Sequence, residues 1–146
     1  MNHSTGIHCI LELYECPFEL LNDETFIRQA ITMAADQSGS TLLAMTSHKF
    51  SPQGVTALGL LAESHISIHT WPETGYAAAD VFTCGSNCDP QKACRFLSNL
   101  LRSKRNNMSV VPRGPRMPSN VISFPGPNQN LQEDACKRPT PHPPFG

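Results

Sequence analysis

Residues 63–85 read ESHISIHTWPETGYAAADVFTCG, and this stretch decides the fold that the sequence predicts. Two runs rich in β-branched and aromatic residues flank the tetrapeptide PETG at 72–75, whose proline and glycine are typical of a tight turn. The chain is therefore expected to reverse at this point. If Trp71 and Tyr76 face each other across the turn, the two runs pair as antiparallel strands with a defined register.

That register places a thiol across from the peptide bond that joins Glu63 to Ser64, because residue 63 falls opposite Cys84. Alternation along the first strand also sorts its side chains into two faces. One face carries polar and aromatic residues, namely His65, Ser67, His69 and Trp71, whereas the other carries Ile66 and Ile68. A solvent-facing polar strand with an incidental aromatic would give the same pattern, so alternation alone does not identify a site.

Outward from this hairpin, the same criteria predict the remaining elements. Strands are expected at 7–14, 41–50, 55–71, 76–84 and 108–112, and helices at 23–39 and 89–101. The order is β-α-β-β-β-α-β. Two helices can cover one face of an antiparallel sheet, so the predicted fold is an α+β two-layer sandwich. The other face must meet water or a second sheet, and a homodimer is the simplest way to cover it.

Composition limits the classes of function. A length of 146 residues suits one domain with a tail, and nine of the thirteen prolines lie at position 112 or later. We therefore expect a domain at 1–113 and a mostly unstructured tail at 114–146. The net charge of −1 favours neither nucleic acid nor an anionic membrane as a partner. Neither a spanning apolar run nor an export signal is evident, which favours a cytoplasmic location.

The cysteines and histidines raise the question of a metal site. Six cysteines are present at irregular spacing, and without an export signal reduced thiols are expected. Cys84 and Cys88 are four residues apart, as are His65 and His69. A closed zinc site usually needs a second closely spaced cysteine pair, which is missing. We therefore expect no metal.

The longest informative run is FSPQGVTALGLLAESHISIHTWPETGYAAADVFTCG, from Phe50 to Gly85. This run resembles the small prokaryotic S-adenosylmethionine decarboxylases, and the resemblance covers roughly residues 6–113. It is long and contiguous, whereas a lone Glu-Ser-His would carry no weight. The tail lies outside the resemblance.

The resemblance implies a proenzyme that cuts itself between Glu63 and Ser64. The hydroxyl of Ser64 attacks the preceding carbonyl and turns the amide into an ester, and elimination then leaves a pyruvoyl group at position 64. The two chains, 1–63 and 64–146, stay associated. The pyruvoyl group forms a Schiff base with the substrate, so neither pyridoxal phosphate nor a metal is implied.

The resemblance also assigns roles to three further residues. His69 matches the processing base, Cys84 matches the proton donor, and Thr56 stands where many relatives carry a serine that supports processing. One difficulty is geometric: five residues of straight strand separate Ser64 from His69 by about 16 Å. Either the chain bends near the cleavage point, or another strand or subunit brings the two residues together.

For the substrate, the resemblance implies S-adenosylmethionine. Phe50 and Trp71 match positions that line the nucleoside pocket, and Glu73 matches a carboxylate for the ribose hydroxyls. Aromatic faces suit both a flat adenine and a cationic sulfonium. Decarboxylation would supply the aminopropyl donor for spermidine and other polyamines. Two alternatives remain: a pyruvoyl-dependent arginine or ornithine decarboxylase, and an uncleaved, non-enzymatic regulator.

Overall fold

The computed structural model describes residues 5–116, 119, 121–124 and 126. The chain divides into two compact units, Met1–Arg116 and Met117–Gly146. In the second unit the described residues form neither a helix nor a strand. Most of the expected tail at 114–146 lies outside the described residues, so its lack of structure stays a prediction.

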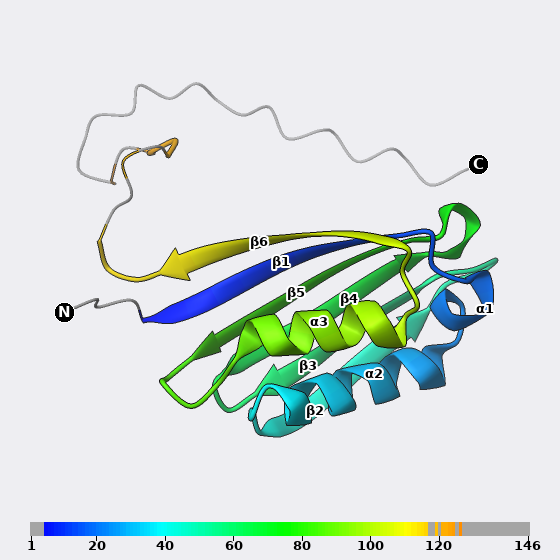
Figure 1. Cartoon of the computed structure of the whole chain (residues 1–146), viewed down its shortest axis with the longest axis horizontal. Helices are drawn as coiled ribbons and strands as arrows, with labels where there is room; N and C mark the ends of the chain where they lie inside the picture. The colour runs from blue at the N-terminus through cyan, green and yellow to red at the C-terminus, as the bar shows by residue number, and fades with distance from the viewer. Residues whose placement is uncertain (1–4, 117–118, 120, 125, 127–146) are drawn as a thin grey trace, which may run out of the picture. The chain divides into compact units, whose positions relative to one another are not determined.

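The first unit is built on a six-stranded sheet in the order β2-β3-β4-β5-β1-β6 (Figure 1). Every neighbouring pair is antiparallel. The strands are β1 (Gly6–Tyr14), β2 (Leu42–Lys49), β3 (Val55–Leu61), β4 (Ser64–Trp71), β5 (Tyr76–Cys84) and β6 (Arg105–Arg113). The predicted antiparallel sheet is confirmed.

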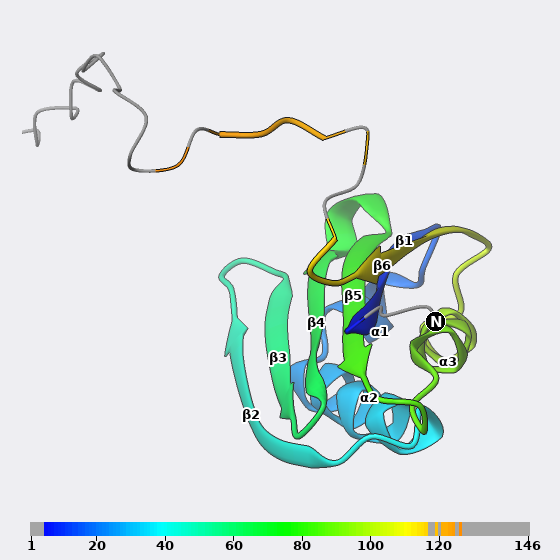
Figure 2. The same cartoon turned by 90° about the vertical axis from the view of Figure 1, so that its left-hand side faces the viewer.

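The helices are α1 (Phe18–Leu21), α2 (Glu24–Gln37) and α3 (Pro90–Leu100), with a short 3₁₀ turn η1 (Pro72–Thr74). The side chain of Asp23 caps α2 and that of Asp89 caps α3, each accepting a hydrogen bond from a backbone N–H in the first turn. Both long helices pack on the same face of the sheet (Figure 2), which confirms the two-layer sandwich. Among the described residues, no helix combines the length and the apolar character needed to cross a membrane.

The hydrophobic core lies between the helices and the covered face of the sheet. Ile66 and Ile68 of β4 are fully buried there, as are Ile27 and Ile31 of α2. The alternate residues of β4 point to the open face, so the predicted sorting of this strand is confirmed. On the open face His65 and His69 are half-buried and Trp71 is exposed, whereas Ser67 is buried against Asp80.

The structure corrects the predicted strand at 55–71. The chain reverses at Ala62 and Glu63, which divides this segment into β3 and β4 and adds a strand to the sheet. Ala-Glu carries none of the residues that favour tight turns. The turn is held from outside, because the backbone of Thr41 accepts a hydrogen bond from Ala62 N–H and donates one to the Glu63 carboxylate.

With this extra turn, and with the four-residue helix α1, the order becomes β-α-α-β-β-β-β-α-β. The predicted register between β4 and β5 is confirmed: Trp71 pairs with Tyr76 and Ser67 with Asp80. Consequently the half-buried residues Glu63 and Ser64 lie at the tip of the β3–β4 hairpin, next to the end of β5.

Candidate active site

The Glu63–Ser64 peptide bond sits in an unusual environment. Ser64 has φ of +155°, a value that residues with a side chain rarely adopt, so the backbone is strained at this bond. The carbonyl oxygen of Glu63 accepts two hydrogen bonds from Cys84, one from its backbone N–H at 3.1 Å and one from its thiol at 3.0 Å. Two donors on one carbonyl polarise it and stabilise negative charge that develops on its oxygen.

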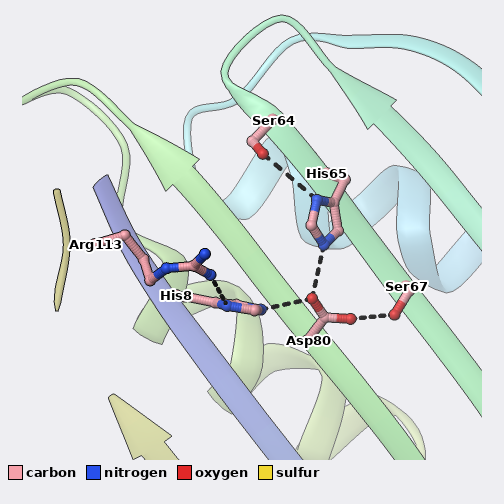
Figure 3. Close-up of polar contacts among 6 residues, drawn as sticks. All are labelled: His8, Ser64, His65, Ser67, Asp80 and Arg113. Carbon is pink, nitrogen blue, oxygen red and sulfur yellow. Dashed lines mark hydrogen bonds and ion pairs between the residues drawn. The ribbon is translucent and has the colours of Figure 1, made fainter. Parts of the chain in front are cut away.

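A histidine stands beside the hydroxyl of Ser64. Nδ1 of His65 lies 3.4 Å from Oγ of Ser64, and Nε2 of the same ring lies 2.7 Å from Oδ2 of Asp80. Figure 3 shows the hydroxyl, the imidazole and the carboxylate in line, on β4 and the neighbouring β5. The arrangement is that of a nucleophile, a base and an acid that orients the base.

Asp80 is held by two further side chains. Nε2 of His8 lies 2.7 Å from the same Oδ2 atom, and the hydroxyl of Ser67 donates to Oδ1. His8 in turn places Nδ1 3.0 Å from the guanidinium of Arg113 (Figure 3). Burial raises the pKa of Asp80, but the hydrogen bonds from Ser67, His8 and His65 together lower it below its ordinary value. At neutral pH Asp80 is therefore an ionised carboxylate.

A pocket of about 340 Å³ lies at the other end of β4. It contains the three residues predicted to bind the nucleoside, together with His69 and Thr56. Its lining is Phe50, Gln53, Gly54, Thr56, His69, Thr70, Trp71 and Glu73. The structure thus gathers in one pocket five residues that the sequence analysis had singled out separately.

The aromatic rings of this pocket are open to solvent. Phe50 is 47% exposed and Trp71 is 43% exposed. The Trp71 ring stacks on Tyr76 with centroids 5.2 Å apart. The Tyr76 hydroxyl donates a hydrogen bond to the Glu12 carboxylate. This hydrogen bond, assisted by burial, raises the pKa of Tyr76 to about 12. Glu73 accepts a bond from the amide of Gln53 at 3.4 Å.

His69 belongs to this second end of the strand. Its Nδ1 atom lies 3.0 Å from Oγ1 of Thr56, on the paired strand β3. β4 stays paired with both neighbours from Ser64 onward, so it does not fold back. Within one chain, therefore, His69 remains about 16 Å along the strand from Ser64. Of the two ways to join them, the structure does not show a bend in β4.

The four residues considered above as zinc ligands make hydrogen bonds to different partners. Cys84 donates to the carbonyl of Glu63 and Cys88 to that of Gly39, while His65 and His69 bond at opposite ends of β4. The cysteines that the structure describes are all free thiols. These four residues therefore do not converge on one point.

Sequence reasoning missed two members of the site, His8 and Asp80, and left His65 and Ser67 without a role. A signal for Asp80 was present, since the predicted register set it opposite Ser67. No sequence signal indicated His8, because its position beside Asp80 depends on the pairing of β1 with β5.

Comparison with known proteins places this geometry in a family. A family model described as S-adenosylmethionine decarboxylase matches residues 7–114. An "S-adenosylmethionine decarboxylase proenzyme" of Prochlorococcus marinus (strain MIT 9211) is 58% identical over 118 residues, covering 80% of this chain and 97% of the relative. A protein of the same name from Synechococcus sp. (strain WH7803) is 62% identical over 98 residues, covering 67% of this chain and 77% of the relative.

A solved structure agrees with these matches. The adenosylmethionine decarboxylase from Aquifex aeolicus superimposes with a TM-score of 0.73 at 32% sequence identity, covering 82% of this chain and 98% of that one. The resemblance noted in the sequence is confirmed: the chain belongs to the S-adenosylmethionine decarboxylase family.

Proposed function

We propose that this protein is a self-processing, pyruvoyl-dependent decarboxylase of S-adenosylmethionine. One observation carries the proposal: the Glu63 carbonyl accepts two hydrogen bonds from Cys84, in a strained turn that also presents the hydroxyl of Ser64. A carbonyl so polarised, beside a nucleophile, is prepared for attack by that nucleophile.

Self-cleavage proceeds by attack of Ser64 Oγ on the carbonyl carbon of Glu63. The oxygen that becomes negative stays between the N–H and the thiol of Cys84. Collapse gives an ester, elimination releases the Glu63 carboxylate, and hydrolysis of the remaining dehydroalanine expels ammonia. The fragments 1–63 and 64–146 stay together because β3 and β4 pair on either side of the cut.

Residue 64 is a fitting place for the pyruvoyl group. A serine is present, its side chain is both nucleophile and leaving group, and the neighbouring donors assist its conversion. Once formed, the group supplies the electron sink needed for loss of CO2. The Cys84 thiol, which lies against the Glu63 carbonyl before cleavage, then holds the proton that returns to the α-carbon of the substrate.

The pocket around Trp71 is the proposed nucleoside site. Exposed rings of Phe50 and Trp71 offer faces for adenine and the sulfonium, and Glu73 offers a carboxylate for the ribose hydroxyls. Arginine and ornithine carry neither an aromatic base nor a ribose. This lining therefore favours S-adenosylmethionine, whose decarboxylated product is an aminopropyl donor for polyamine synthesis.

The proposal includes a homodimer. The nucleoside pocket and Ser64 lie at opposite ends of β4, so one chain does not bring substrate to the cleavage point. The open face between them exposes apolar side chains: Leu60 is 54%, Leu58 42% and Ile10 39% exposed. A second copy packed on this face would cover them and bring its own His69 and Thr56 toward Ser64. The free thiols suit a reducing compartment such as the cytoplasm.

The test of this function is release of labelled CO2 from S-adenosylmethionine, arginine and ornithine, assayed in parallel with fully cleaved protein. We expect release from S-adenosylmethionine alone. Release from arginine or ornithine alone would replace the proposed substrate, and no release from any of the three would remove the support for a decarboxylase.

A further inference from the structure

We propose that His65, oriented by Asp80 and His8, is the base that takes the hydroxyl proton of Ser64 in the first step of self-cleavage. The inference rests on the proposed function and deepens it. It gives a role to the polar network on the open face, whose members had no assigned task, and it separates that role from the one proposed for His69.

Proximity is the first argument. Among residues 5–116, His65 is the histidine whose ring contacts the Ser64 hydroxyl, at 3.4 Å. The contact is long for a hydrogen bond from a hydroxyl, and a shift of about 0.6 Å would bring it to the usual length of about 2.8 Å. His69, by contrast, is engaged by Thr56 at the far end of the strand.

The tautomer of the ring is the second argument. Asp80 is an ionised carboxylate, which only accepts hydrogen bonds, so the Nε2 atom of His65 that it contacts must carry a hydrogen. In the neutral ring the lone pair is then on Nδ1, which faces the Ser64 hydroxyl. The carboxylate thus sets the ring in the one tautomer that can receive the proton.

His8 reinforces this arrangement from β1. Its Nε2 also contacts Oδ2 of Asp80, so this nitrogen likewise carries a hydrogen. Its Nδ1 accepts from the Arg113 guanidinium, which has only donors to offer. His8 therefore fixes the position of Asp80 without drawing the carboxylate away from His65.

A metal ion is the competing reading of the same cluster, because one ligand atom each from His8, His65 and Asp80 lie within 4.8 Å of one another. Binding through both Nε2 atoms would require the opposite tautomers. Nδ1 of His8 would then carry a hydrogen and face the guanidinium of Arg113 at 3.0 Å, donor against donor. The observed bonds favour proton transfer over metal binding.

The step balances without any other reactant. The proton moves from Ser64 Oγ to His65 Nδ1 while Oγ bonds to the carbonyl carbon of Glu63. When the tetrahedral centre collapses, the carbon–nitrogen bond breaks and His65 returns the proton to the departing nitrogen of residue 64. One amide becomes one ester. The later removal of the α-proton is a separate step, which is left to a base such as His69 from a second copy.

The experiment measures self-cleavage of the full chain, freshly made, on denaturing gels. We expect His65→Ala to slow cleavage by about 100-fold or more. Its uncut protein should be an amide and so resist hydroxylamine, which cuts esters. Added imidazole should restore part of the rate, which a purely structural role for His65 does not predict. Asp80→Asn, with the orienting charge removed, should also cleave slowly.

The control is His48→Ala, which removes an exposed histidine from the edge strand β2 and should cleave at the wild-type rate. Thermal unfolding of each variant checks that it folds. If His65→Ala is unstable, His65→Gln keeps a polar side chain of similar reach and should be equally slow to cleave.

Several results would overturn the inference. Cleavage of His65→Ala within a few-fold of wild type would do so, as would build-up of a hydroxylamine-sensitive ester in that variant. Loss of wild-type cleavage on treatment with a metal chelator would favour the metal site instead. Failure of the wild type itself to cleave is a different result, because it would count against the proposed function.

Discussion

The two ends of the open sheet face, one around Ser64 and the other around Trp71, differ in how fully their side chains are held by contacts within one chain. Around Ser64 the groups that we propose begin self-cleavage are hydrogen-bonded within one chain, including the two donors that Cys84 gives to the Glu63 carbonyl. Around Trp71 the rings stand exposed above an open pocket. From this difference we infer that cleavage would start within a single folded chain, whereas substrate binding would need a second surface.

The largest effect is expected from Ser64→Ala, which removes both nucleophile and leaving group from the first end. The chain should remain whole, and no decarboxylase activity should develop. Denaturing gels and CO2 release measure the two outcomes. Ser109→Ala, at an exposed position on β6, is the matched control and should be cut normally. A cut Ser64→Ala chain would mean that another residue is the nucleophile.

Mixing variants tests whether His69 of one copy acts on Ser64 of another. His69→Ala alone should process slowly and Ser64→Ala not at all. When they are co-expressed, chains carrying His69→Ala should be cut, because the Ser64→Ala partner supplies an intact His69 to the intact Ser64. Tagging one of the two chains shows which is cut. Unchanged slow cleavage in the mixture would mean that His69 does not act between copies.

Removing one of the two hydrogen bonds that the Glu63 carbonyl accepts should slow self-cleavage less than losing Ser64 does. Cys84→Ala keeps the backbone N–H but loses the thiol, and we expect cleavage to slow by about 100-fold. Cys84→Ser keeps a donor and should cleave faster than Cys84→Ala. The control is Cys88→Ala, whose thiol bonds elsewhere. If processed Cys84→Ala protein decarboxylates at the wild-type rate, Cys84 is not the proton donor.

The smallest effects are expected at the second end. Loss of the aromatic ring in Phe50→Ala or Trp71→Ala should cost about 1 kcal/mol of stacking, which raises KM for S-adenosylmethionine about fivefold. Glu73→Gln should weaken nucleoside binding in the same way. None of these variants should slow self-cleavage. The measurement therefore compares the change in KM for S-adenosylmethionine with the change in the rate of self-cleavage. Phe18→Ala, at an exposed ring on α1, is the control. Equal loss of cleavage and binding would contradict the separation of the two ends.

The sequence predicted the turn between β4 and β5 but missed the turn between β3 and β4, for a physical reason. Pro72 and Gly75 carry the local signals of a turn, so the register of β4 with β5 followed from them. The turn at Ala62 and Glu63 carries no such signal, because the backbone of Thr41 holds it from a distant part of the chain. Tertiary contacts of that kind are invisible to local patterns.

The site divides along the same line. Ser64, His69 and Cys84 could be predicted as site residues because their neighbours in sequence carry the resemblance. His8 escaped notice because its role arises only when β1 lies beside β5 and delivers its ring to Asp80. A separation of 72 positions between His8 and Asp80 leaves no local pattern to read.

The most direct test of the central claim is the intact mass of the purified protein under denaturing conditions. We predict two chains, residues 1–63 and 64–146, with the larger lighter than its serine-started form by the mass of one ammonia, as conversion of Ser64 to a pyruvoyl group requires. A single chain of 16.0 kDa in an active preparation would contradict the account, as would a larger fragment that begins with an unmodified serine.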